Sequence, residues 1–113
     1  TEFQTAQRGF VANGLPKYAG WAALGVAATY QMQAFIPLAQ ITVADTPEAA
    51  KSKKMASIAL FHQAEQAYQQ CIDLGSKVFD PLYKQKVLDC GCVYYQKVAR
   101  DNQAQVEKTL TNQ

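Results

Sequence analysis

Four side chains in this sequence could serve as zinc ligands or form a catalytic Cys–His pair: His62, Cys71, Cys90 and Cys92. Structural zinc sites use such ligands, but two to four residues typically separate their paired cysteines, whereas one residue separates Cys90 from Cys92. A Cys–His dyad is also disfavoured, because an ideal helix places His62 and Cys71 on opposite sides. We therefore predict no metal site and no catalytic cysteine.

Motifs of the common catalytic classes are missing from the sequence. It contains no glycine-rich phosphate loop, no GxSxG or HExxH motif and no EF-hand loop. The carboxylates are dispersed, and we interpret Asp73, Asp80 and Asp89 as solvated or helix-capping groups rather than as an acid–base pair. The sequence predicts a protein that is not an enzyme and that uses no cofactor.

Length and composition indicate a single domain over residues 1–113. The chain has 113 residues, of which 49% are hydrophobic and 18% charged, and its formal net charge is +2. Its dense basic cluster, Lys51, Lys53 and Lys54, contains no aromatic residue. Because nucleic-acid binders usually show a broader stripe of phosphate-neutralising residues, we expect no nucleic-acid partner.

The charges are unevenly distributed along the chain. The sequence has 11 basic and 9 acidic residues, yet residues 1–44 carry only Glu2, Arg8 and Lys17. A helix over the charge-free residues 18–44 would be about 40 Å long, which is enough to cross a bilayer. This stretch is interrupted by Thr29, Gln31, Gln33, Pro37 and Gln40. We therefore expect it to be buried within a bundle or against a partner protein, with membrane contact as the alternative.

Nearly all of the sequence has a helical pattern. We expect a short helix over 2–12, stopped by Asn13-Gly14, and a second helix over about 17–35, which Pro37 ends or kinks. Residues 36–44 are ambiguous and could be extended. Two stripes follow the second helix, a small one of Ala19, Ala23 and Ala27 and a bulky one of Trp21, Leu24, Ala28, Met32 and Phe35. Small residues allow another backbone to approach closely.

Two further helices have clear starts, because Thr46-Pro47 and Asp80-Pro81 each combine an N-cap residue with a proline at the first helical position. The third helix carries one apolar seam, made of Ala56, Leu60, Ala64, Ala67, Cys71, Leu74 and Val78 and widened by Phe61, Tyr68, Ile72 and Phe79. The fourth helix, from Pro81 to about Leu110, carries two seams. The first is Tyr83, Val87, Cys90 and Tyr94, and the second is Leu88, Cys92, Tyr95, Ala99 and Val106.

The short turn near residues 79–81 predicts that the third and fourth helices form an antiparallel hairpin over about 47–111. Aligning the third helix with the first seam of the fourth gives these pairs: Val78 with Tyr83, Leu74 with Val87, Cys71 with Cys90, and Ala67 with Tyr94. Facing positions of packed helices can bring two Cα atoms within reach of a disulfide. We therefore predict a Cys71–Cys90 disulfide, with three buried thiols as the alternative.

A disulfide would imply an oxidising compartment, such as a periplasm, an organelle lumen, the intermembrane space or the exterior. The sequence begins with Thr rather than Met, so either it has been trimmed or a targeting segment has been removed, and we expect the second. No combination of a basic region, an apolar core and a cleavage site is left in the sequence.

Three segments resemble the tetratricopeptide repeat family: Asp80-Pro81-Leu82-Tyr83, Gly91-Cys92-Val93-Tyr94-Tyr95 and Trp21-Ala22-Ala23-Leu24-Gly25. The glycines of the last two are separated by nearly twice the repeat length of about 34 residues. The resemblance covers about a third of the chain, and Val98-Ala99-Arg100 stands where the family has a small-residue turn. It implies helical hairpins that bind a peptide in a concave groove.

We expect an all-α fold, a helical bundle of three long helices plus a short N-terminal helix, with a charge-free segment over 17–44 and a hairpin over 46–112. The predicted function is that of a non-catalytic accessory or scaffold subunit that binds other protein subunits, with association to a membrane left open. The predicted interface residues are Ala19, Trp21, Ala23, Leu24, Ala27, Tyr30, Met32 and Phe35. The alternatives are a tetratricopeptide-like module and a carrier of an apolar ligand, whose enclosed cavity would be lined by Trp21, Phe35, Phe61 and Tyr68.

Overall fold

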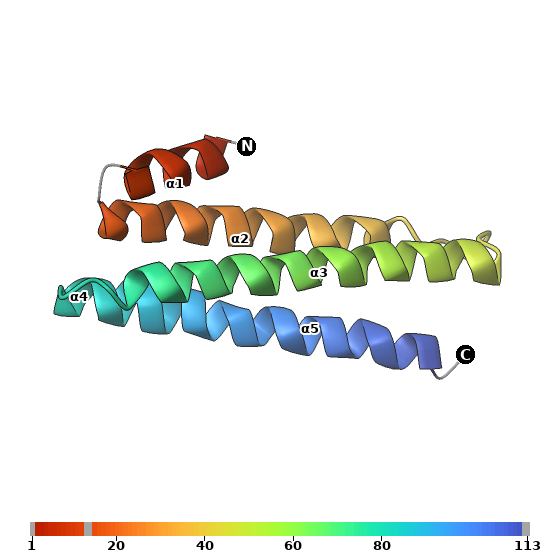
Figure 1. Cartoon of the computed structure of the whole chain (residues 1–113). Helices are drawn as coiled ribbons and strands as arrows, with labels where there is room; N and C mark the ends of the chain where they lie inside the picture. Colours follow the sequence, from red (N-terminus) through yellow and green to blue (C-terminus); the bar gives the residue numbers. More distant parts are fainter. Residues whose placement is uncertain (1, 13–14, 112–113) are drawn as a thin grey trace.

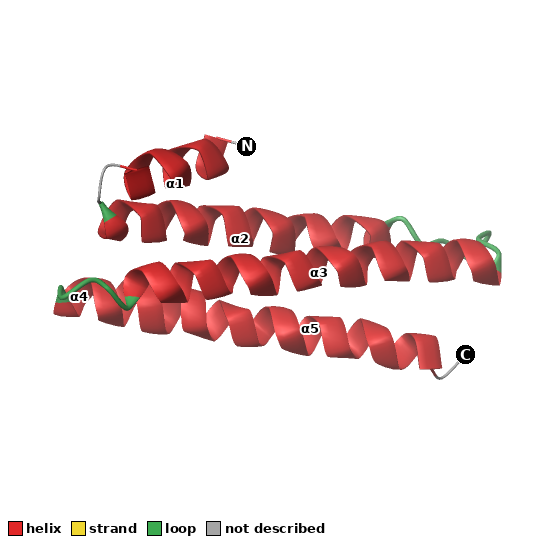
Figure 2. Cartoon of the chain, viewed as in Figure 1, coloured by secondary structure: helices red, strands yellow, loops and turns green. Residues whose placement is uncertain are grey.

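The computed structural model describes residues 2–12 and 15–111, and most of these residues are helical (Figure 1, Figure 2). The elements are α1 (Glu2–Ala12), α2 (Pro16–Ala39), α3 (Pro47–Gly75), α4 (Pro81–Tyr83), the π-helical stretch η1 (Lys84–Val93) and α5 (Tyr94–Thr111). No strand occurs within the described ranges. The predicted all-α bundle is confirmed. Asn13-Gly14, the predicted stop of the first helix, lies outside the described residues.

Helix α3 is the central element of the bundle. It packs against α2 on one side and against η1 and α5 on the other, while α1 packs on α2 (Figure 1). The bundle is elongated and flat, with principal extents of 51 × 24 × 15 Å. Its buried apolar residues form three clusters along α3, which contain Cys71, Tyr68 and Phe61 respectively. Because α3 is the main partner of both α2 and α5, each of these two helices has another side that does not face this core.

The small stripe of α2 forms its contact with α3. Ala23 belongs to the same buried cluster as Cys71, and Ala27 belongs to the same cluster as Ala64 and Ala67. Alanine against alanine lets two helix backbones approach closely, and larger side chains here would overpack the core. The backbone that approaches the small stripe closely, as predicted, is therefore that of α3 in the same chain.

Helix α2 continues past Pro37, which corrects the predicted end of this helix near residue 35. Pro37 lies in the last turn of the helix and is followed there only by Leu38 and Ala39. Proline leaves the carbonyl four residues earlier without its helical partner, and that carbonyl belongs to Gln33, an exposed residue. The loss of this one helical hydrogen bond therefore costs little free energy at this position. Residues 36–39 are helical, so the extended conformation considered for 36–44 does not apply to them.

The loop between α2 and α3 is held by a lysine from α3. Lys53 Nζ donates to Asp45 Oδ2 at 2.7 Å and to the Gln40 carbonyl at 2.8 Å. The hydrogen bond from Lys53 is the main reason why the pKa of Asp45 lies below its ordinary value. The helix then begins as predicted, because Thr46 Oγ1 accepts a hydrogen bond from the backbone N–H of Ala49 at 3.1 Å.

Asp80 caps the start of α4, as the sequence predicts. Its Oδ1 accepts from the backbone N–H of Leu82 at 3.0 Å and of Tyr83 at 3.4 Å. Its Oδ2 forms an ion pair with Lys17 Nζ at 3.0 Å, which ties the turn to the beginning of α2. Phe79, which we expected to widen the seam of α3, lies in this turn and is 91% exposed. The expectation was wrong because α3 ends at Gly75, before the seam reaches Phe79.

The predicted fourth helix changes its winding along its length. A π-helix closes its hydrogen bonds over five residues instead of four, so Cys92 comes close to the face of Val87, five residues earlier. The buried residues are Tyr83 and Val87 from the first predicted seam, and Cys92, Ala99 and Val106 from the second. Because of the π-helical stretch, the helix buries its first seam at its beginning and its second seam from Cys92 onward. We call this change the seam transfer.

This transfer corrects the predicted disulfide. Cys71 is bonded to Cys92, with 5.9 Å between their Cα atoms, and Cys90 is an exposed free thiol. The predicted Cys71–Cys90 pair was wrong because it assumed a regular α-helix, which would keep Cys90 and Tyr94 opposite α3. Tyr94 is 57% exposed instead. A disulfide is compatible with an oxidising compartment.

Candidate partner-binding groove

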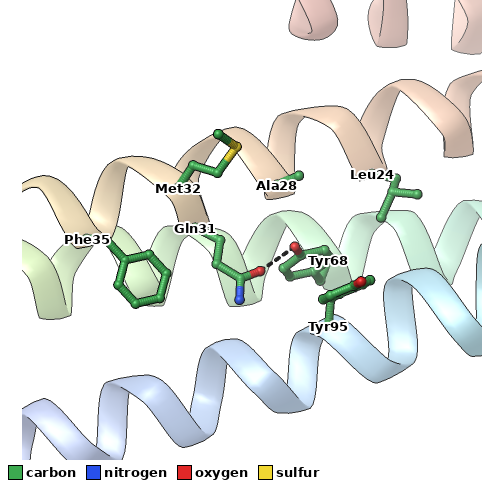
Figure 3. Close-up of a pocket in the computed structure, with 7 residues that line it drawn as sticks. All are labelled: Leu24, Ala28, Gln31, Met32, Phe35, Tyr68 and Tyr95. Carbon is green, nitrogen blue, oxygen red and sulfur yellow. Dashed lines mark hydrogen bonds between the residues drawn. The ribbon is translucent and has the colours of Figure 1, made fainter.

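An open groove of about 460 Å³ lies over α3, between α2 and α5 (Figure 3). It is lined by Leu24, Ala28, Gln31, Met32 and Phe35 from α2, by Tyr68 from α3 and by Tyr95 from α5. None of these residues is charged. Apart from one amide and two phenol hydroxyls, the lining is apolar, so the groove is suited to covering apolar surface.

The groove side of α2 is set by the spacing of its bulky residues. Leu24, Ala28, Gln31 and Phe35 follow one another at intervals of four, three and four, which places them on one face of a helix. Ala27, immediately before Ala28, is fully buried. The two predicted stripes thus have separate roles: the small one lies inside the bundle, and the bulky one, apart from Trp21, follows the groove.

Three of the predicted interface residues are internal to the chain. Ala19, Ala23 and Ala27 are at most 1% exposed, because their small side chains face the interior of the bundle. Side chains that the chain itself covers cannot meet a partner. The predicted interface is therefore corrected to exclude this stripe.

Three other predicted interface residues lie in the groove. Met32 and Phe35 are exposed, while Leu24 is partly buried and packs against the core. The Phe35 ring meets the buried ring of Phe61 edge to face, with 5.2 Å between centroids. Phe35 is therefore fixed on one side by the core and open to solvent on the other.

The remaining two predicted interface residues lie elsewhere. Trp21 lines a separate hollow beside Lys17. Tyr30 is partly buried, and its hydroxyl accepts a hydrogen bond from Gln4 Nε2 of α1 at 3.1 Å. Tyr30 thus contributes to the packing of α1 on α2 rather than to the groove.

The floor of the groove is a buried phenol. Tyr68 is 1% exposed, and its hydroxyl donates a hydrogen bond to Gln31 Oε1 at 2.5 Å (Figure 3). The Tyr95 ring stacks with it at a centroid distance of 6.4 Å. Burial, with a further contribution from Tyr95, raises the pKa of Tyr68 to about 12. Tyr68 therefore remains neutral and keeps its hydrogen bond to Gln31 near neutral pH.

Gln31 and Tyr95 belong to the groove, although neither is among the interface residues predicted from the sequence. Gln31 interrupts a charge-free stretch, and its spacing from Ala28 and Phe35 is the signal that it shares their face. Tyr95 belongs to the second seam of its helix, and its position depends on where the π-helical stretch changes the winding.

The four residues predicted to line the cavity of a carrier do not line one common hollow among those of the described part of the chain. Of the four, Phe35 and Tyr68 line the groove. Phe61 is fully buried in the core, and Trp21 lies in the other hollow. The four side chains therefore do not surround one space.

His62 lies on the surface of α3. Its Nε2 is 3.2 Å from Gln66 Nε2 and its Nδ1 is 3.6 Å from Glu65 Oε2. Among residues 2–12 and 15–111, no three His, Cys, Asp or Glu side chains gather where they could hold a metal ion. Over the same ranges, no helix combines the length and the apolar character needed to span a membrane.

No family model, curated protein or solved structure matches this chain. The segment after Asp80 that resembles a tetratricopeptide repeat does not fold as the helix pair of that family. Residues 81–111 continue without a turn after Tyr95, where a repeat would begin its second helix. The resemblance therefore does not extend to the fold of this segment.

Proposed function

We propose that this chain is a non-catalytic subunit that binds one helix of a partner protein in the groove between α2 and α5. The observation that carries the proposal is the row of exposed apolar side chains along the groove, Met32, Phe35 and Tyr95, which are 72%, 46% and 45% exposed. Large apolar side chains that gather in one place, instead of being scattered, are typical of an interaction site.

A helix suits the groove because helices form both of its borders. Since α3 packs against α2 and against α5, the channel over α3 has the position that a further helix of a bundle would occupy. Helix-in-groove recognition places apolar side chains at intervals of three and four residues into such a channel. The uncharged lining favours an apolar partner face rather than a charged one.

The open form of the groove favours a protein over a small molecule. Sites for small ligands bury most of the ligand surface, whereas most of the Met32 side chain here faces solvent. A partner helix, in contrast, would cover the exposed side of Met32 with its own side chains. The Tyr68 hydroxyl is already bonded to Gln31, so covering this part of the floor with apolar atoms leaves no unpaired phenol.

The test compares Met32→Glu with Met55→Glu in the full chain. Both methionines are exposed, but Met55 lines a different hollow, formed mainly by α3 and α5. Each tagged variant is recovered from the cells that make the protein, and circular dichroism checks that both remain helical. We expect Met32→Glu to lose a co-purifying polypeptide that Met55→Glu retains, because a glutamate would bury a charge in the interface.

Other outcomes contradict the proposal. If both variants keep the same polypeptides, the groove does not hold them. If light scattering finds a wild-type dimer that Met32→Glu dissociates, the occupant is a second copy of this chain. If native mass spectrometry finds an apolar small molecule that Met32→Glu releases, the chain is a carrier.

A further inference from the structure

A second exposed apolar surface lies at the end of the bundle where α2 begins and α3 turns into α4 (Figure 1). We call it the turn-end surface and define it by Trp21, Phe79 and Leu82. These side chains are 54%, 91% and 61% exposed. Trp21 and Leu82 line the same hollow, and Phe79 lies in the turn just before Leu82. This surface is separate from the groove, with which it shares no lining residue.

Lysines accompany these apolar side chains. Lys17 and Lys86 line the hollow, and Lys84 Nζ lies 5.7 Å from the centroid of the Phe79 ring. The carboxylate that lines the hollow, Asp80, is paired with Lys17 at 3.0 Å. Lys84 and Lys86 therefore add positive charge that Asp80 does not neutralise. The result is a mixed surface of large apolar side chains and cationic groups.

We propose that the turn-end surface binds a membrane that contains anionic lipids, with its apolar side chains among the headgroups. Tryptophan and other aromatic side chains are favoured at the boundary between headgroups and acyl chains. Lysines near a membrane surface are attracted to anionic lipids, and their flexible stems let the charged group remain in water. The two kinds of side chain here occur together, as this mode of binding requires.

The position of Phe79 favours a membrane over an acidic protein. It lies in a turn at one end of a bundle 51 Å long, so it can reach a flat surface without help from a complementary cavity. Binding here would anchor the bundle at one end and leave the groove accessible. The proposal does not depend on a partner in the groove, and either can fail without the other.

Trp21 makes the test direct, because it is the single tryptophan of the sequence and belongs to the surface itself. Purified full chain is mixed with vesicles of phosphatidylcholine alone, or of phosphatidylcholine with phosphatidylserine. We expect the Trp21 emission to shift to the blue, and the chain to float with the vesicles, only when phosphatidylserine is present. Added salt should weaken both signals, because it screens the lysines.

Variants separate the surface from the rest of the molecule. Phe79→Glu, and the double variant Lys84→Glu with Lys86→Glu, should each lower partitioning into the anionic vesicles by at least about tenfold. Val43→Glu is the control, because Val43 is fully exposed in the loop between α2 and α3, away from this surface. Its partitioning should equal that of the wild type. Circular dichroism verifies that the variants stay helical.

Several results would overturn the proposal. They are an absence of binding to the phosphatidylserine vesicles, equal binding to both kinds of vesicle, and a loss in Val43→Glu as large as in Phe79→Glu. Binding to polyglutamate but not to vesicles would assign the surface to an acidic protein instead.

Discussion

Tyr83 lies directly against Gly20, so that a β-carbon on this glycine would overlap the tyrosine hydroxyl and lie 3.2 Å from Cζ. A β-carbon on Gly75 of α3 would lie 3.0 Å from Leu88 Cδ1 and in ordinary contact, at 3.4 Å, with Cε1 of the same ring. Gly20 thus provides the space that the Tyr83 hydroxyl fills, and Tyr83 is 3% exposed. The close packing of Tyr83 on α2 depends on this missing side chain.

Gly20→Ala is therefore expected to lower the free energy of unfolding by about 1–3 kcal/mol, because the ring must move to admit a methyl group. Gly9→Ala is the control, because no atom of the described part of the chain lies within 4 Å of a β-carbon added there. Alanine is the better helix former, so this control should be as stable as the wild type or more stable by up to about 1 kcal/mol. Urea unfolding followed by circular dichroism measures both. Equal destabilisation of the two variants would contradict the contact.

Tyr83→Phe should partly restore the Gly20→Ala variant. The Tyr83 hydroxyl is buried and has no hydrogen-bond partner among the described residues, so removing it breaks no bond there and relieves the overlap. In the wild-type background the same change should cost little. A double-mutant cycle measures the coupling between the two positions, and additive effects would show that hydroxyl and methyl do not meet.

Alkaline pH should destabilise the protein through Tyr68. Its folded-state pKa of about 12 lies above the ordinary value of 10.0, so the native state keeps a proton that the unfolded state loses. The contribution of this group to stability is complete below pH 10.0 and is lost as the pH rises towards about 12. Tyr68→Phe should show a shallower loss over this range. Urea midpoints measured at a series of pH values give the two slopes, and equal slopes would rule out Tyr68 as the source.

Acid pH should destabilise the protein through Asp80. The hydrogen bond from Lys17, and then the one from the Tyr83 backbone, hold the pKa of Asp80 below its ordinary value of 3.8. A lowered folded-state pKa gives stability that is present above the ordinary value and is lost as the pH falls through the folded-state pKa. Thermal unfolding between about pH 5 and pH 2 measures this loss.

Substitutions at Asp80 separate its two roles. Asp80→Asn keeps a capping oxygen but cannot be ionised, so its melting temperature should depend less on acid pH. Asp80→Ala removes the cap as well and should melt below Asp80→Asn at neutral pH. Identical melting of the two variants at neutral pH would show that the cap contributes nothing.

Alkylation without a reductant should modify Cys90 alone. Cys71 and Cys92 are bonded to each other, whereas Cys90 is exposed. Tandem mass spectrometry locates the alkyl group, and a label on Cys92 would contradict the Cys71–Cys92 bridge. Cys92→Ser should lose roughly 3 kcal/mol of stability on the chain-entropy model, because the bridge closes a loop with a sequence separation of 21.

Local signals in the sequence predict the starts of helices well. Thr46-Pro47 and Asp80-Pro81 carry both the capping oxygen and the residue that favours the first turn, and each caps its helix in the structure. These signals act between residues a few positions apart. They need no knowledge of the tertiary fold, which explains their success.

The winding of residues 84–93 depends on tertiary contacts instead. The sequence shows two seams on this helix, but either one can continue along a regular α-helix when the segment is considered alone. The choice of Cys92 over Cys90 is made by packing against α3, and the π-helical stretch is how the chain accommodates it. The pairing of the cysteines could not be predicted without that contact.

The groove could be predicted only in part for a similar reason. The bulky stripe of α2 is visible in the sequence, and two of its members, Met32 and Phe35, are exposed. Their contact with a partner stays a prediction. Which of the two stripes faces outward depends on which one α3 covers. Tyr68 and Tyr95 complete the lining from two other elements, and their meeting with Gln31 is a property of the assembled bundle.

Occupation of the groove by a partner is tested most directly by a photoreactive amino acid at position 32, with the same amino acid at position 55 as the control. Met32 lines the groove and Met55 lines the other hollow, so illumination in the cells that make the protein should attach one polypeptide at position 32 and not at position 55. Identical products from the two positions, or none from position 32, would contradict a partner helix between α2 and α5.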